Sequence, residues 1–281
     1  TSGTAPDGHN SYNHATDAYY ADVDDTCADN GDPTDTILGT AYIPDGVELI
    51  NGRVDLAGMT SWSKSEEDLL RDYLNKATRF KRAGLDFTRR GTPAGSNWVL
   101  GEGQLQYSMF GPDNITAANI SGDGLNDSDG NLIPGDFHWV VDFGNWNGSD
   151  YAENTHKGLF TINFGSHKQK WSQDNNAMRA LLAQPEWGLT SAWGGRPYWF
   201  FHTGNMGYPA GDWAKRTQNN GNRDYVPEGA YTYMRGAAWN NLMGDPSLRM
   251  HPVAPPENVS ATRSGGEVTL SWTASTDPSV I

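Results

Sequence analysis

Residues 158–171 read GLFTINFGSHKQKW, and this stretch decides the fold. Its first part, residues 159–164, is a short apolar run rich in aromatic and β-branched side chains, which predicts a strand buried on both faces of a parallel sheet. The strand is expected to stop at Gly165 and Ser166, where the chain must turn. Ligands and chemistry gather at the carboxyl ends of strands in open α/β sheets, so Ser166 occupies the position where a nucleophile would stand.

The segments around this strand predict the remaining elements of an α/β fold. Residues 64–83 carry apolar side chains at helical spacing, with Ser63 and Glu66 as a predicted capping box and Gly84 as the predicted C-cap. Strands that alternate with helices imply βαβ units and a mostly parallel sheet. Further strands are predicted over residues 47–56, 98–105, 137–143 and 188–193, helices over residues 175–183 and 231–243, and a long loop over residues 194–224.

The composition narrows the classes of function. The formal net charge of the 281 residues is −14, which disfavours nucleic-acid binding because phosphate recognition needs a cationic face. Cys27 is the only cysteine, so the chain cannot form an internal disulfide. No apolar run approaches the ~20 residues of a membrane-spanning helix. The chain is therefore expected to act without a membrane span and without a nucleic-acid partner.

The tail has a different character from the rest of the chain. Residues 255–275 read PPENVSATRSGGEVTLSWTAS, with period-two alternation on both sides of a Gly-Gly pair. This pattern predicts a β-hairpin.

Several short motifs resemble those of the gingipain-type cysteine peptidases, a family with a caspase-like fold, and they occur in the family's order. The YYAD sequence at residues 19–22 resembles the family's Tyr-Tyr-x-Asp segment, and LINGRV at residues 49–54 resembles its strand ending in Gly-Arg. SAW at residues 191–193 resembles the substrate-pocket strand, and NLMGDPSL at residues 241–248 resembles the motif that closes the domain. The resemblance covers about residues 17–252.

The resemblance implies a division into two parts. Residues 1–252 are expected to form a gingipain-like α/β domain, with a caspase-like, mostly parallel sheet flanked by helices. Residues 253–281 are similar to the first strands of a fibronectin type III or immunoglobulin-like module. The family's first strands have no counterpart at the start of this sequence, so an absent amino-terminal segment or a separate chain is expected to complete the sheet.

The resemblance also identifies the positions of a catalytic dyad. In this family a histidine follows one strand and takes the proton of a cysteine that ends the next strand, so that the thiolate attacks a peptide carbonyl. Asn145 aligns with the histidine and Ser166 with the cysteine. An asparagine amide accepts no proton at neutral pH, and a serine hydroxyl is a weak nucleophile without a base. The expected function is therefore a pseudoenzyme, a peptidase-like domain that binds rather than cleaves.

Two other functions stay open. Ser166 could serve an active extracellular hydrolase if His202 folds back over the strand ends as its base, with Asp142 as a third member. The chain could instead be a structural subunit of an extracellular assembly, which the expected incompleteness of the sheet favours.

Aromatic and basic side chains near the dyad positions suggest a ligand. Trp146, Trp193 and Arg196 are the predicted substrate-binding residues, and a peptide or a carbohydrate is the predicted ligand, because aromatic platforms stack on sugar rings. Packing in the core is the competing interpretation for the tryptophans.

An acidic loop predicts calcium as the cofactor. Calcium prefers several oxygen ligands at alternating loop positions, with glycines allowing the turn. The sequence SGDGLNDSDGN supplies them, although it lacks the final bidentate glutamate of an EF-hand, and a solvated acidic turn is the alternative. The predicted ligands are Asp123, Asn126, Asp127, Asp129 and Asn131. Together with the acidic surface and the trailing β-module, this loop suits a secreted or cell-surface bacterial protein.

Overall fold

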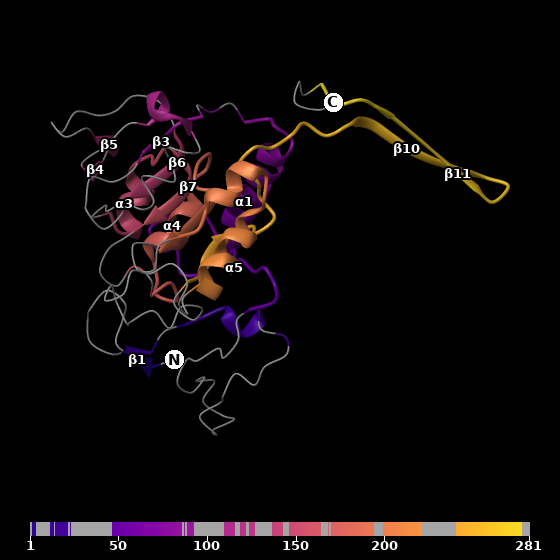
Figure 1. The fold of residues 1–281 in the computed structure, drawn as a ribbon. Helices are drawn as coiled ribbons and strands as arrows, with labels where there is room; N and C mark the ends of the chain where they lie inside the picture. Colours follow the sequence, from indigo (N-terminus) through magenta and orange to yellow (C-terminus); the bar gives the residue numbers. More distant parts are fainter. Residues whose placement is uncertain are drawn as a thin grey trace.

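The structure is a computed structural model, and it describes a subset of the chain. The described residues are 2–3, 12–13, 15–21, 23, 47–85, 87, 89–92, 110–115, 119–121, 124–126, 137–142, 146–163, 168, 170–193, 199–220 and 240–276. Within them the fold is mixed α/β, with small sheets and helices (Figure 1). The predictions of a strand over residues 98–105 and of a helix over most of residues 231–243 lie outside the described residues.

A five-stranded sheet forms the centre of the structure. Its order is β3 (Gly91–Thr92), β6 (Phe137–Asp142), β7 (Gly158–Asn163), β8 (Thr190–Trp193) and β9 (Leu242–Gly244). The first four strands are parallel, and β9 is antiparallel to β8. The predicted strands over residues 137–143 and 188–193 are confirmed, and so is the mostly parallel sheet.

Strand β7 lies at the middle of this sheet, as its apolar sequence predicts. All six of its residues are buried, since parallel neighbours flank both edges and helices cover both faces. The Phe160 ring packs against Phe80 of helix α1 (Glu66–Lys81) at 5.6 Å between ring centroids, and against Trp213 of helix α5 (Ala210–Asn220) at 5.7 Å. On the opposite face, the Asn163 amide donates to the hydroxyl of Tyr151 in helix α3 (Gly148–Glu153).

Helix α1 confirms the predicted helix but not its predicted caps. Ser65, rather than Ser63, is the N-cap, and its hydroxyl accepts a hydrogen bond from the Asp68 backbone N–H at 3.2 Å. At the other end Ala83, rather than Gly84, adopts the left-handed conformation with φ 54°, while the Gly84 N–H donates to the Arg79 carbonyl. Capping depends on local geometry that the bare spacing of Ser and Glu does not specify.

Two helices were missed by the sequence analysis, and one was predicted well. Helix α4 (Ala177–Ala183) matches the predicted helix, and the Asn176 side chain caps it by accepting from the Met178 N–H. Helix α3 was not predicted, although Asn147 and Asp150 form a capping box at its start. The prediction that residues 194–224 form a loop is wrong over two stretches, which form the 3-10 helix η4 (His202–Met206) and α5.

The strand predicted over residues 47–56 does not form, and this segment contributes only an isolated β-bridge. Arg53 pairs with Met243 of β9, with reciprocal backbone hydrogen bonds to Leu242 and Gly244. The predicted helix over residues 231–243 is wrong at its end, since Leu242 and Met243 belong to β9. A short apolar run cannot be assigned to helix or strand from its periodicity alone.

Strands β10 (Glu257–Ser264) and β11 (Glu267–Thr273) pair in antiparallel fashion and extend away from the central sheet (Figure 1). Gly265 and Gly266 join them with φ angles of 57° and 91°. Two further antiparallel pairs are small: β1 (Ser2–Gly3) with β2 (Tyr12–Asn13), and β4 (Asn119–Ser121) with β5 (Gly124–Asn126). Among the described residues, no helix is long and apolar enough to cross a membrane.

Candidate functional site

The carboxyl ends of three central strands are level with one another. Asp142, the last residue of β6, is the register partner of Asn163, the last residue of β7. Asn163 is in turn the partner of Trp193, the last residue of β8. The segments that leave these strands therefore start at one edge of the sheet, which is where α/β folds place their sites.

Asn163 anchors the end of β7 with a satisfied buried amide. Its side-chain nitrogen donates to the Tyr151 hydroxyl at 2.9 Å, and its side-chain oxygen accepts from the Lys168 ammonium at 2.9 Å. Asn163 is fully buried, so these two bonds offset the cost of removing the amide from water. The contact with Lys168 also holds together the two ends of the short segment that contains Ser166.

The chain after Lys168 is held through its backbone carbonyls. The Asn176 amide donates to the carbonyls of Lys168 at 2.7 Å and Lys170 at 3.2 Å. The Arg179 guanidinium, on α4, donates to the Gln173 carbonyl at 2.6 Å. Side chains at the start of α4 thus fix the loop that follows the Ser166 segment. Because these contacts are to backbone carbonyls, they do not depend on the side chains of the loop.

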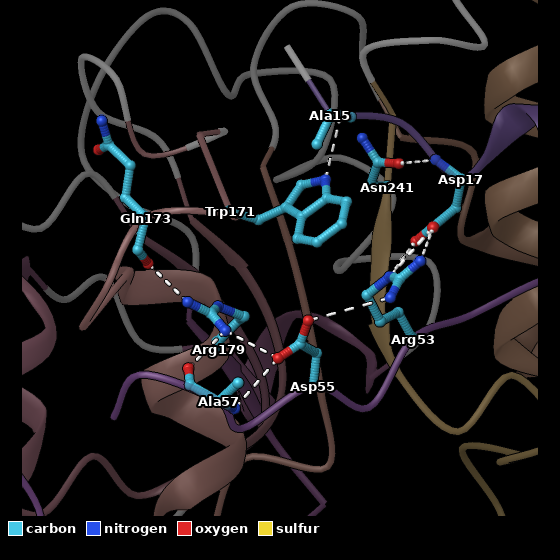
Figure 2. A network of polar contacts seen from close by, with 9 residues as sticks. All are labelled: Ala15, Asp17, Arg53, Asp55, Ala57, Trp171, Gln173, Arg179 and Asn241. Carbon is cyan, nitrogen blue, oxygen red and sulfur yellow. Dashed lines mark hydrogen bonds and ion pairs between the residues drawn. The ribbon is translucent and has the colours of Figure 1, made fainter. Parts of the chain in front are cut away.

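Arg53 is the centre of a polar network beside this loop (Figure 2). Its guanidinium makes a bidentate ion pair with the Asp17 carboxylate, with Nε 2.9 Å from Oδ2, and lies 4.6 Å from the centroid of the Trp171 ring. Asp55 stands further away, with its Oδ2 at 3.9 Å from Nη1 of Arg53. Hydrogen bonding to Asp17 raises the pKa of Arg53 above its usual value, so the guanidinium stays charged.

Asp55 links this network to a second arginine. Its Oδ1 accepts from Nη1 of Arg179 at 2.8 Å, and the same nitrogen donates to the Ala57 carbonyl at 2.6 Å. The Arg179 side chain is only 3% exposed, so a carboxylate partner and carbonyl acceptors are needed to stabilise its charge. The network thus pairs two carboxylates with two guanidiniums.

The network also holds an amino-terminal segment, residues 15–21, against the α/β core. The Trp171 indole nitrogen donates to the Ala15 carbonyl at 3.1 Å. The Asp17 backbone N–H donates to Oδ1 of Asn241 at 2.9 Å, and the Asp17 carbonyl accepts from the Asn51 amide at 2.7 Å (Figure 2 shows the Trp171 and Asn241 contacts). The segment is thus recognised through both its main chain and its carboxylate.

The structure describes only part of the sequence-predicted site. Asn145, Ser166 and Arg196 lie outside the described residues, and for His202 the structure describes the backbone in η4 but not the side chain. Trp193 and Trp146 are described, with 0% and 5% of their surfaces exposed, and both belong to the hydrophobic core. Their role as ligand contacts, like the dyad assignment, stays a prediction.

Of the five predicted calcium ligands, the structure describes only Asn126, and of that residue only the backbone. Asn126 ends β5, as the register partner of Asn119 in β4, so the first half of the predicted loop belongs to this short hairpin and Asp123 lies in the connection between its strands. The oxygen donors of the sequence are those that calcium prefers. Asp123, Asp127, Asp129 and Asn131 lie outside the described residues. Elsewhere in the described part of the chain, no group of three or more His, Cys, Asp and Glu residues could hold a metal ion.

Sequence reasoning missed the network around Arg53. The motifs at residues 19–22 and 49–54 were singled out separately, but Asp17 and Arg53 are 36 positions apart and no periodic pattern connects them. The one available signal is that an arginine directly follows Asn51-Gly52 inside an apolar segment, where a buried charge would need a partner.

Comparisons with models of protein families, with curated proteins and with solved structures found no match to this chain.

Proposed function

We propose that this chain is a secreted or cell-surface, gingipain-like domain without peptidase activity, which acts as a binding or structural module. In this proposal residues 1–252 form the caspase-like domain, and residues 253–281 begin a fibronectin type III or immunoglobulin-like module. The observation that carries the proposal is the register of β6 and β7, whose last residues, Asp142 and Asn163, are partners on adjacent parallel strands.

This register relates the two dyad positions to the ends of adjacent strands. Asn145 and Ser166 each follow their strand by three positions, counted from Asp142 and Asn163. Turns that leave adjacent parallel strands start at the same edge of a sheet, which is the arrangement that a dyad requires. A sheet with these two strands apart, or in opposite directions, would have removed the basis of the proposal.

The residue types at these positions argue against cleavage. An amide has no basic lone pair to accept the serine proton, and an unactivated hydroxyl attacks a peptide carbonyl slowly. The same edge can still bind a ligand, since binding requires shape and hydrogen bonds but no proton transfer.

The proposal includes an extracellular setting and a calcium ion. The net charge of −14 and the acidic sequence of residues 121–131 support both. Asp123, Asn126, Asp127, Asp129 and Asn131 would hold the ion through oxygen atoms, and its contribution would be to order this loop.

Turnover of a peptide library, followed by mass spectrometry, tests the proposal. We expect no cleavage above buffer by the wild-type chain or by the Ser166→Ala variant. Cleavage that is lost in Ser166→Ala would contradict the proposal, and its loss in His202→Ala as well would establish the hydrolase alternative. A structural role additionally predicts self-association, so a monodisperse monomer in light scattering would leave binding as the function.

A further inference from the structure

The segment formed by residues 15–17 is held as a bound peptide would be. Four side chains from three separate parts of the chain converge on it, namely Asn51, Arg53, Trp171 and Asn241. Three of these contacts engage main-chain groups: the carbonyl of Ala15, and the N–H and carbonyl of Asp17. Hydrogen bonds to the main chain of a segment give affinity, and side-chain contacts add specificity.

Specificity comes from a single carboxylate. Asp17 is the only side chain of the segment that makes an ion pair with the core, and it does so through both oxygens against Arg53. The side chain of Asp17 is 8% exposed, and that of Arg53 is 32% exposed. A bidentate arginine–carboxylate pair in such a partly buried position selects for geometry as well as for charge.

Two of the recognising side chains are held in place by residues other than 15–17. Arg53 lies on the Trp171 ring, and its backbone is fixed by the bridge to Met243. The loop of Trp171 is held independently by Arg179 and Asn176 through carbonyls. Arg53 and Trp171 are therefore positioned by the α/β core itself, as a binding site requires.

We infer that Asn51, Arg53, Trp171 and Asn241 form a binding site for a peptide segment carrying one aspartate, which residues 15–17 occupy in cis. Release of the segment uncovers the site for a peptide from another molecule. The net charge of −14 disfavours a run of acidic residues, so the recognised peptide has a single carboxylate against Arg53. This inference rests on the proposed function, since it names a ligand class for a domain that binds without cleaving.

Competition between the two segments provides the test. The probe is a fluorescent peptide with the sequence of residues 12–21, YNHATDAYYA, and a control probe carries asparagine in place of its aspartate. Asp17→Ala in the full chain removes the ion pair that holds the cis segment. We expect the Asp17→Ala chain to bind the aspartate probe at least tenfold more tightly than the wild-type chain does, and more tightly than it binds the asparagine probe.

Two further variants distinguish recognition of the aspartate by Arg53 from a general loss of stability. Asp17→Ala combined with Arg53→Gln should lose the preference for the aspartate probe. Asp72→Ala, which breaks the exposed ion pair with Lys64, should bind no better than the wild-type chain. If circular dichroism shows that Asp17→Ala does not fold, Asp17→Asn takes its place, because it keeps the side-chain shape and one oxygen acceptor.

The outcomes distinguish this inference from the proposed function. Equal binding of both probes, or no gain in the Asp17 variants, overturns the inference while the function stands. Cleavage of the probe during the experiment, seen by mass spectrometry, contradicts the proposed function instead.

Discussion

The ammonium of Lys76 on α1 donates to the carbonyl of Leu182 at the end of α4, with 3.0 Å between Nζ and O. It also donates to the carbonyls of Gln184 at 2.7 Å and of Trp187. The residue is 2% exposed, so α1 is attached to the α4–β8 connection by a buried amine. Burial disfavours the charged ammonium, the Asp72 carboxylate favours it, and burial has the larger effect on the pKa of Lys76.

This burial predicts a rise in stability with pH. Burial lowers the pKa of Lys76 from 10.5 to about 7, so between these values the unfolded chain binds a proton that the folded chain lacks. The free energy of unfolding should therefore increase between pH 7.5 and 9.5 by roughly 1.4 kcal/mol per pH unit from this residue. Urea unfolding across this range measures the slope.

Lys76→Met should remove this part of the slope, because methionine does not titrate. Lys157→Met, at an exposed position, is the matched control and should keep the wild-type slope. Parallel curves for wild type and Lys76→Met would show that Lys76 has an ordinary pKa in the folded chain.

His156 should make the stability of the chain depend on pH in the acidic range. It is buried between α3 and β7, its Nδ1 accepts from the Gly158 N–H at 3.2 Å, and burial lowers its pKa from 6.5 to about 3. The stability due to the neutral ring is complete above pH 6.5 and falls as the pH drops towards 3, because only the unfolded chain gains the proton.

The His156→Asn variant tests this effect, since asparagine keeps an acceptor and does not titrate. Between pH 6.5 and 4.5 the wild-type chain should lose about 1.4 kcal/mol per pH unit more than the variant. Chemical denaturation at several pH values gives both slopes, and identical slopes would mean that the imidazole is accessible to protons in the native state.

Gly188, in the connection from α4 to β8, predicts a large loss on substitution. Its φ is +67°, and a Cβ there would lie 1.9 Å from the Leu181 carbonyl oxygen. Gly207 has a φ of +85° but no heavy atom within 4 Å of such a Cβ. Gly207→Ala should therefore cost about 1–2 kcal/mol from backbone strain alone.

Gly188→Ala should cost about 3 kcal/mol or more, because the backbone of α4 must also shift. Thermal or urea unfolding of both variants provides the comparison. Equal losses would indicate that α4 and β8 approach each other less closely than the structure shows.

The central strands were predictable because each is a run of consecutive apolar residues, which indicates a buried strand. The apolar runs of β6 and β7 need no partner to be recognised, and their pairing follows from the βαβ rule. Helix α1 was also predictable from its own sequence, since Leu69, Tyr73 and Phe80 recur at helical spacing on one face. Its caps were missed by two positions, from Ser63 to Ser65, because several neighbouring residues can cap a helix.

The elements that were missed depend on contacts far apart in the sequence. Helix α5 has only a short apolar stripe, with Trp213 packed on Phe160, and the surrounding glycines and aromatics resemble a loop. The ion pair of Asp17 with Arg53 joins two segments whose own sequences give no register. Such contacts are fixed by the tertiary fold, so local sequence patterns cannot reveal them.

The central claim is that Asn145 and Ser166 occupy the two positions of a peptidase dyad at neighbouring strand ends. Restoring the dyad tests this claim in a Cys27→Ser background, which leaves one thiol in the chain. The comparison is between Ser166→Cys alone, Ser166→Cys with Asn145→His, and Ser166→Cys with Asn145→Gln as the control that accepts no proton.

Alkylation by iodoacetamide between pH 6 and 7 is the measurement. A neighbouring imidazole lowers the pKa of a thiol and increases its thiolate fraction, so the double variant with Asn145→His should react about tenfold faster than the other two. Equal rates for all three variants would place the two positions out of contact and contradict the account.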